Sequence, residues 1–188
     1  MTARFSILGL CFGLLLSCSS TTTSYYVLSP AGQAPNRQGV GLGIGPIIAA
    51  NYLVERPYVL FQASPNQIEM SDYHQWAGEL DDNFGRVLGI NLGRRTGTGR
   101  IQPYPWDTNN ELDYQVTVDL SQFHGTTDGD AFMEASWRLY RLPVGNLIAS
   151  NTTTLTAPLR GDGYDALVSA QSELVDQLAA EIAKSMKK

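Results

Sequence analysis

The sequence predicts an α+β protein, with a mostly antiparallel sheet and two main helices packed on one face of it. In 112–123 and 132–142 apolar and polar residues alternate, which is typical of strands with one buried face, and a threonine-rich segment, 147–155, follows them. In 72–93 and 163–186 apolar residues recur at helical spacing instead. A chain of 188 residues suits one domain with its own core.

The first predicted elements are short strands. Residues 25–28 are β-prone and end at Ser29-Pro30, after which a loop rich in glycine, proline and asparagine continues to residue 38. In 39–46 apolar residues alternate with glycine. A phosphate-binding glycine loop needs a helix directly after it, and Pro46-Ile-Ile-Ala-Ala-Asn51 is a poor helix start. We therefore expect a strand whose bare face lets another backbone approach closely.

A turn and two further strands are expected before the first long helix. Residues 52–57 are typical of a turn. Residues 58–62 and 67–70 are typical of strands, and the sequence Ser64-Pro65-Asn66 predicts a turn between them.

The first long helix is predicted over 72–93. Ser71 or Asp72 is expected to cap its start, and Gly93 is expected to end it. Acidic residues lie toward its N-terminal half and arginines at its end, as the helix dipole favours. The apolar positions that define the helix are Trp76, Leu80, Phe84, Val87, Leu88 and Leu92.

The segment 93–100 is a basic loop. Its simplest interpretation is a solvated turn, and the alternative is contact with a phosphate or an acidic partner. We treat Arg94 and Arg95, together with Trp76, as candidate partner-interface residues. Trp76 and Trp137 are assigned to the core first and to a partner surface only second.

The second half of the chain is expected to form an edge segment, a meander and a helix. Prolines place 100–105 at a sheet edge, because proline cannot donate a hydrogen bond to a neighbouring strand. Turns at 124–130 and 143–146 separate the three long strands. The helix over 163–186 ends in lysines, which suit the negative end of its dipole.

Composition and motifs exclude several kinds of function. The net charge is −5 at pH 7, so we expect no binding to nucleic acid. His74 and His124 lack ligand spacing, and Asp128 and Asp130 lack the remaining residues of a calcium loop. We expect no metal, no cofactor and no catalytic residues, with both histidines as surface or capping residues. The protein is therefore predicted not to be an enzyme.

The N-terminal segment has the features of a secretory signal. Arg4 precedes an apolar run over 5–16, which is shorter than the ~20 residues of a membrane-spanning helix. The run ends in Leu15-Leu16-Ser17-Cys18, which resembles the lipobox of bacterial lipoproteins. An ordinary secreted protein with a chance cysteine is the alternative.

The lipobox resemblance implies a lipid anchor. It makes 1–17 a signal peptide, Cys18 the lipidated first residue of the mature protein, and 18–24 a flexible tether. Ser19 is the sorting position. An aspartate there directs enterobacterial lipoproteins to the inner membrane, so serine implies the outer membrane. Residues 25–188 are then expected to form a single α+β domain in the periplasm, without a thiol, because Cys11 leaves with the signal peptide.

Several motifs resemble one family when they are taken in order. They are the lipobox, Tyr25-Tyr-Val-Leu-Ser-Pro30, Tyr52-Leu-Val-Glu-Arg-Pro57, His74-Gln-Trp-Ala77, the strand over 114–123, Ala135-Ser-Trp-Arg138 and Gly163-Tyr-Asp-Ala-Leu-Val-Ser-Ala170. The family is the auxiliary lipoproteins of ABC-type and MCE lipid-transport systems, including paraquat-inducible protein C. The resemblance implies a lipoprotein that is anchored in the outer membrane and faces the periplasm. It would dock an MCE-domain protein anchored in the inner membrane, in support of lipid transport and envelope integrity.

Two alternatives remain beside this adaptor role. A stand-alone lipid-binding or carrier lipoprotein would need a large apolar cavity. We expect none, because the apolar faces of the predicted helices and strands are just large enough to cover one another. An enzyme needs converging polar residues, which the sequence does not indicate. Assembly into a homo-oligomer is left open.

Overall fold

A computed structural model of the chain describes residues 22–33, 38–107 and 111–186. The predicted signal peptide (1–17), Cys18 and Ser19 lie outside the described residues. Within the described part, no helix is long and apolar enough to cross a membrane.

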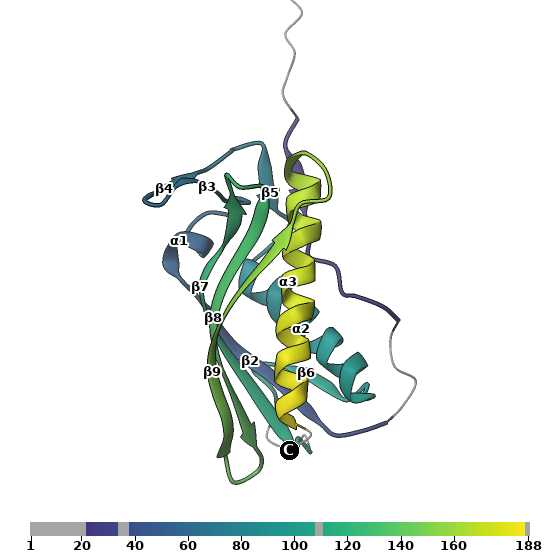
Figure 1. Ribbon diagram of the computed structural model, residues 1–188. Helices are drawn as coiled ribbons and strands as arrows, with labels where there is room; N and C mark the ends of the chain where they lie inside the picture. The colour runs from purple at the N-terminus through teal and green to yellow at the C-terminus, as the bar shows by residue number, and fades with distance from the viewer. Residues whose placement is uncertain (1–21, 34–37, 108–110, 187–188) are drawn as a thin grey trace, which may run out of the picture.

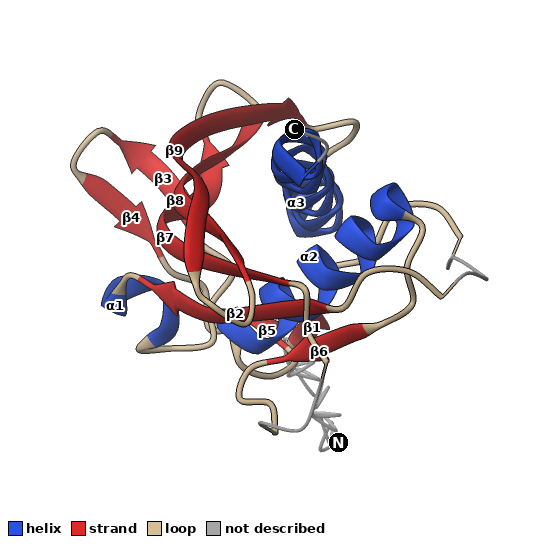
Figure 2. Ribbon diagram, turned by 90° about the horizontal axis from the view of Figure 1, so that it is seen from below, coloured by secondary structure: helices blue, strands red, loops and turns tan. Residues whose placement is uncertain are grey.

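A curled seven-stranded sheet holds two long helices on its concave side (Figure 1, Figure 2). A separate two-stranded sheet lies near the N-terminal end of the described chain. In chain order the elements are β1 (Ser24–Tyr26), β2 (Leu42–Ala49), α1 (Asn51–Val54), β3 (Phe61–Ser64), β4 (Gln67–Glu69), β5 (His74–Trp76), α2 (Leu80–Thr96), β6 (Ile101–Pro103), β7 (Tyr114–Thr126), β8 (Asp130–Arg141), β9 (Asn146–Pro158) and α3 (Gly163–Met186).

The large sheet is mixed, which corrects the prediction of a mostly antiparallel sheet. The meander β7–β8–β9 is antiparallel, as expected, and so is the β3–β4 pair. However, β2 pairs in parallel with both β6 and β7, and β3 pairs in parallel with β7. A parallel neighbour requires a long crossover connection, and the segment between β2 and β7 contains α1, α2 and four short strands. The α+β class itself fits the structure.

The core lies between the concave face of the sheet and the two helices. The alternation predicted the buried faces correctly, since Val116 and Val118 of β7 and Trp137 and Leu139 of β8 are all buried. The apolar stripe of α3 meets β8 and β9, and α2 packs against α3 and β2. All of these buried side chains belong to one cluster. Burial of large side chains such as Trp137 contributes roughly 2–3 kcal/mol each.

The first long helix starts and ends later than the sequence predicted. Residues 74–76, expected in its first turn, form β5, which pairs in parallel with β1. Gly78 has φ of 128°, a conformation that no continuous helix tolerates, and α2 begins two residues later. At the other end Gly97, with φ of 75°, caps the helix and donates its N–H to the carbonyl of Gly93. Gly93 therefore lies inside the helix and does not end it.

Three other boundaries also differ. The predicted turn at 52–57 starts as the single helical turn α1, and β2 continues through Pro46 to Ala49. The predicted turn at 124–130 is shorter, because β7 extends to Thr126 and β8 resumes at Asp130. By contrast, β6 lies at the end of the strand order, so the predicted edge position of 100–105 is confirmed.

Candidate functional site

Helix α2 approaches β2 and β6 through three glycines spaced four residues apart. A Cβ on Gly85 would lie 3.1 Å from Cγ1 of Ile47, and one on Gly89 would lie 3.0 Å from Cγ2 of Ile101. A Cβ on Gly93 would lie 2.6 Å from the carbonyl oxygen of Thr98. The three glycines share one face of the helix, since residues four apart lie above one another. Sequence reasoning missed this contact, although the regular glycine spacing was a visible signal.

An apolar groove of about 710 Å³ opens beside this helix–strand contact. We call it the α2–β6 groove. Its volume is within the range of about 300–1,000 Å³ that is usual for small-molecule sites. The charged side chains in its lining are Asp81, Asp82 and Arg86 of α2. The remaining lining residues are Ile44, Gly45, Pro46, Ile47, Gly85, Ile90, Ile101, Pro103 and Tyr104.

The floor of the groove is built on an irregularity in β2. The pairing of β2 with β7 shifts register between Ile44 and Ile47, on either side of Pro46, which has no N–H to donate. The carbonyl of Gly45 instead accepts a hydrogen bond of 2.9 Å from Nε2 of Gln115. The Ile44 carbonyl accepts one of 2.9 Å from the N–H of Tyr104.

The alternating glycines just before and within β2 receive other parts of the chain on their bare face, as predicted. The backbone of Glu111 and Leu112 lies against Gly41, and the ring of Trp106 lies 2.8 Å from where a Cβ of Gly43 would be. Tyr104 covers Gly45 in the same way and meets Trp106 edge to face, with ring centroids 5.5 Å apart. Since these contacts use the space of missing side chains, the segment is a packing element and not a phosphate loop.

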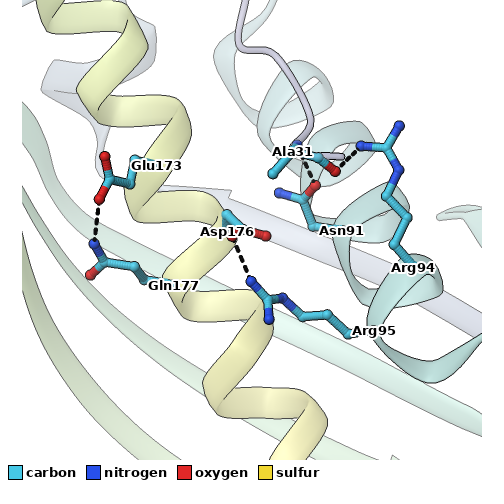
Figure 3. Close-up of polar contacts among 7 residues, drawn as sticks. All are labelled: Ala31, Asn91, Arg94, Arg95, Glu173, Asp176 and Gln177. Atoms are coloured by element: carbon cyan, nitrogen blue, oxygen red, sulfur yellow. Dashed lines mark hydrogen bonds and ion pairs between the residues drawn. The ribbon is translucent and has the colours of Figure 1, made fainter. Parts of the chain in front are cut away.

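The structure does not bring the three candidate interface residues together. Trp76 is only 3% exposed and stacks near Phe123, so it lies in the core to which it was first assigned. The guanidinium of Arg94 donates to the carbonyl of Ala31 (Figure 3). Arg95 pairs with Asp176 of α3 at 2.5 Å. Both arginines thus hold parts of the same chain against α2.

Residues of α2 also hold the extended segment that follows β1. The amide oxygen of Asn91 accepts a hydrogen bond of 2.9 Å from the N–H of Ala31 (Figure 3), and Arg86 donates to the carbonyl of Leu28 at 3.2 Å. Together with Arg94, these contacts connect the N-terminal part of the domain to the helix that forms one wall of the groove.

The two histidines occupy different parts of the molecule. His74 lies on β5, where Nδ1 is 2.9 Å from the hydroxyl of Tyr26 and the ring stacks on Tyr164 at 3.8 Å. His124 is 1% exposed in β7, which corrects its predicted surface position. Burial lowers the pKa of His124, and a hydrogen bond to the Gly125 carbonyl opposes this effect in part. In the described ranges no three His, Cys, Asp or Glu side chains converge as a metal site would require.

Residues 26–183 match a protein family described as the ABC-type transport auxiliary lipoprotein component. The match covers nearly the whole folded domain. The chain belongs to this family. No curated protein matches the sequence.

Solved structures share the fold of this auxiliary lipoprotein. An uncharacterized protein is 24% identical, and the similarity covers 88% of this chain and 99% of the other, with a TM-score of 0.71. Protein XCC0632 from Xanthomonas campestris, of the family DUF330, is 17% identical over 85% of this chain and 92% of the other, with a TM-score of 0.64.

Proposed function

We propose that this auxiliary lipoprotein is a non-catalytic, outer-membrane component of an MCE/ABC-type intermembrane lipid-transport system. Lipidated Cys18 would hold it at the periplasmic face, and the domain would dock the periplasm-spanning MCE protein and support envelope integrity. The observation that carries the proposal is the family match over 26–183, which assigns a transport-auxiliary role to nearly the whole domain.

The α2–β6 groove supplies a docking surface for this role. Its apolar lining suits an apolar segment of the transport partner. Among the described strands, β6 beside it lies at the edge of the sheet and pairs with β2. Edge strands offer backbone groups to a second chain. We propose an apolar, extended segment of the MCE partner as the occupant.

A second function, binding or carrying a lipid as a stand-alone protein, is favoured by the same groove. The sequence led us to expect no large apolar cavity, but the structure has a groove of about 710 Å³ lined by residues of α2, β2 and β6. This groove would accept an acyl chain along its apolar lining.

A pull-down from crosslinked envelopes separates the two functions. The mature, affinity-tagged protein is isolated, and its companions are identified by mass spectrometry. Recovery of an MCE-domain protein supports the adaptor. Recovery of phospholipid without a protein partner refutes the adaptor and favours the carrier.

A matched pair of variants tests the groove itself. Ile90→Glu places a carboxylate among the apolar groove residues, whereas Ile48→Glu places one on the exposed side of β2. We expect Ile90→Glu to lower recovery of the partner by about tenfold or more, since burying a carboxylate under the partner costs several kcal/mol, whereas an exposed ion pair with Arg86 one turn earlier returns only about 0.5 kcal/mol. Ile48→Glu should retain it. Equal recovery by both variants would exclude the groove as the docking surface.

A further inference from the structure

An exposed aromatic surface lies on the small β1–β5 sheet. The two strands pair in parallel, with Tyr25 opposite Gln75. Because side chains alternate between the faces of a strand, Tyr25 and Val27 point to the same side as Tyr73 and Gln75. Tyr25 is 65% exposed, Val27 51% and Tyr73 46%.

Tyr58 lies at the edge of this surface and is partly buried against the core. Tyr58 forms an antiparallel bridge with Gln75, and its hydroxyl donates a hydrogen bond of 2.5 Å to Asp72. We call the exposed surface formed by Tyr25, Val27 and Tyr73 the tyrosine face.

The opposite side of the same small sheet is fastened to the domain. The hydroxyl of Tyr26 is 2.9 Å from Nδ1 of His74, and the His74 ring stacks on Tyr164 at the start of α3. Trp76, the next inward residue of β5, is buried in the core. The tyrosine face is therefore presented by a rigid support and not by a loose chain end.

The position of the lipid anchor relates this surface to the membrane. Six peptide units join Cys18 to Ser24, the first residue of β1, and even fully extended they span only about 20 Å. Figure 1 places β5 and the start of α3 at one end of the molecule and the β8–β9 turn at the other. A lipid on Cys18 therefore keeps the β1–β5 end close to the bilayer.

We propose that the tyrosine face rests on the headgroup region of the membrane that carries the lipid anchor. Tyrosine suits this position because its ring is apolar and its hydroxyl remains hydrated. Glu55, Arg56 and Asp72 are exposed nearby and carry a net negative charge, so the surface suits zwitterionic better than anionic lipid. Contact would orient the domain on the bilayer and add a second membrane-binding signal. The inference rests on anchoring through Cys18, as in the proposed function.

The test attaches the mature chain to vesicles by a deliberately weak anchor. Cys18 is the only thiol in 18–188, so it couples to a maleimide that bears one fourteen-carbon chain. A single chain of this kind binds membranes only marginally, which makes the bound fraction sensitive to a second signal. The vesicles contain phosphatidylcholine and phosphatidylethanolamine, and the bound fraction is measured by flotation.

Two double variants are compared with the wild type. Tyr25→Ser with Tyr73→Ser removes the two exposed aromatic rings of the tyrosine face. Val144→Ser with Leu147→Ser removes a similar amount of exposed apolar surface at the β8–β9 turn, at the far end of the molecule. We expect the first to weaken vesicle binding by about fivefold or more, in proportion to the apolar area removed, and the second to leave it unchanged.

Two outcomes overturn the inference. If neither double variant changes binding, the tyrosine face does not touch the bilayer and is free for a protein partner. If both double variants weaken vesicle binding equally, the protein touches the bilayer through exposed apolar side chains in general and not through the tyrosine face. Because the anchor is attached chemically and no partner protein is present, the result does not depend on whether the cell lipidates Cys18 or on MCE docking.

Discussion

His124 shows how one buried titratable side chain depends on its strand. Its ring is stacked on Phe132 with centroids 5.4 Å apart, Nδ1 lies 3.1 Å from the Gly125 carbonyl oxygen, and Nε2 lies 3.2 Å from the side-chain amide of Gln122. The sequence His124-Gly125-Thr126-Thr127 suggested a turn, yet the pairing of His124 with Phe132 extends the hairpin past this point. Partners across the sheet thus bury a residue that local sequence places at a hairpin tip.

We predict that His124 makes the domain less stable in mild acid. Burial lowers its pKa in the folded state, so the unfolded chain takes up a proton first as the pH falls. Its contribution to the free energy of unfolding is complete above the ordinary histidine pKa of about 6.5 and is lost as the pH falls toward the folded-state pKa.

The check is urea unfolding of the wild type and His124→Gln at about pH 7.5 and pH 5.5. The wild type should lose more stability between these pH values than the variant, because glutamine does not titrate. An identical loss in both would assign the acid sensitivity to other groups.

At the level of elements, α2 is positioned by its glycine face. A glycine inside a helix costs about 1 kcal/mol relative to alanine, and this helix carries three of them on one side. The close approach to Ile44, Ile47 and Ile101 explains why the helix carries glycines despite this cost. Side chains on this face would separate the helix from β2 and β6. The same approach sets the width of the α2–β6 groove.

We predict opposite effects for two alanine substitutions on this face. Gly93→Ala should destabilise the fold by about 2 kcal/mol or more, because its Cβ would clash with the backbone carbonyl of Thr98, which cannot move aside cheaply. Gly85→Ala should be neutral or stabilising by up to about 1 kcal/mol. Its Cβ would meet only the side chain of Ile47, which is partly exposed and can shift.

Thermal and urea unfolding of the two variants measure this difference. The substitution and the gain in helix propensity are the same in both, so only the local packing differs. Equal stability of Gly93→Ala and Gly85→Ala would mean that α2 does not approach the 98–101 segment as closely as the structure has it.

For the whole molecule, the proposed anchor is the feature that decides where the domain works. Residues 18 and 19 lie before the described part of the chain, and the folded domain begins a few residues later at β1. Two or more acyl chains hold a protein stably on a membrane, whereas the folded domain offers only surface contacts.

We predict that two single substitutions relocate the protein. Cys18→Ser should move it from the membrane fraction to the soluble periplasmic fraction, because the thioether that carries the lipid cannot form. Ser19→Asp, expressed in an enterobacterial host, should move it from the outer to the inner membrane. Cell fractionation with immunoblotting measures both. Retention of Cys18→Ser in the outer membrane would refute lipid anchoring at this cysteine.

Local periodicity was sufficient to predict the elements that have one simple buried face. The helix predicted over 163–186 is α3, Gly163–Met186, and the alternation in 112–142 gave the correct inward residues of β7 and β8, including Trp137. These features follow from the spacing of apolar residues, which is 3.6 along a helix and 2 along a strand. The buried face of such an element can therefore be predicted from the order of residues within the element itself.

Strand partners and the groove depend on residues that are distant in the chain. The parallel pairing of β2 with β7 joins segments about 70 residues apart, and the groove is formed where 44–47, 81–90 and 101–104 meet. Apolar spacing tells which face of a segment is buried but not which segment covers it. That choice, and the shape of the groove, depend on how closely the glycines of α2 let three elements pack.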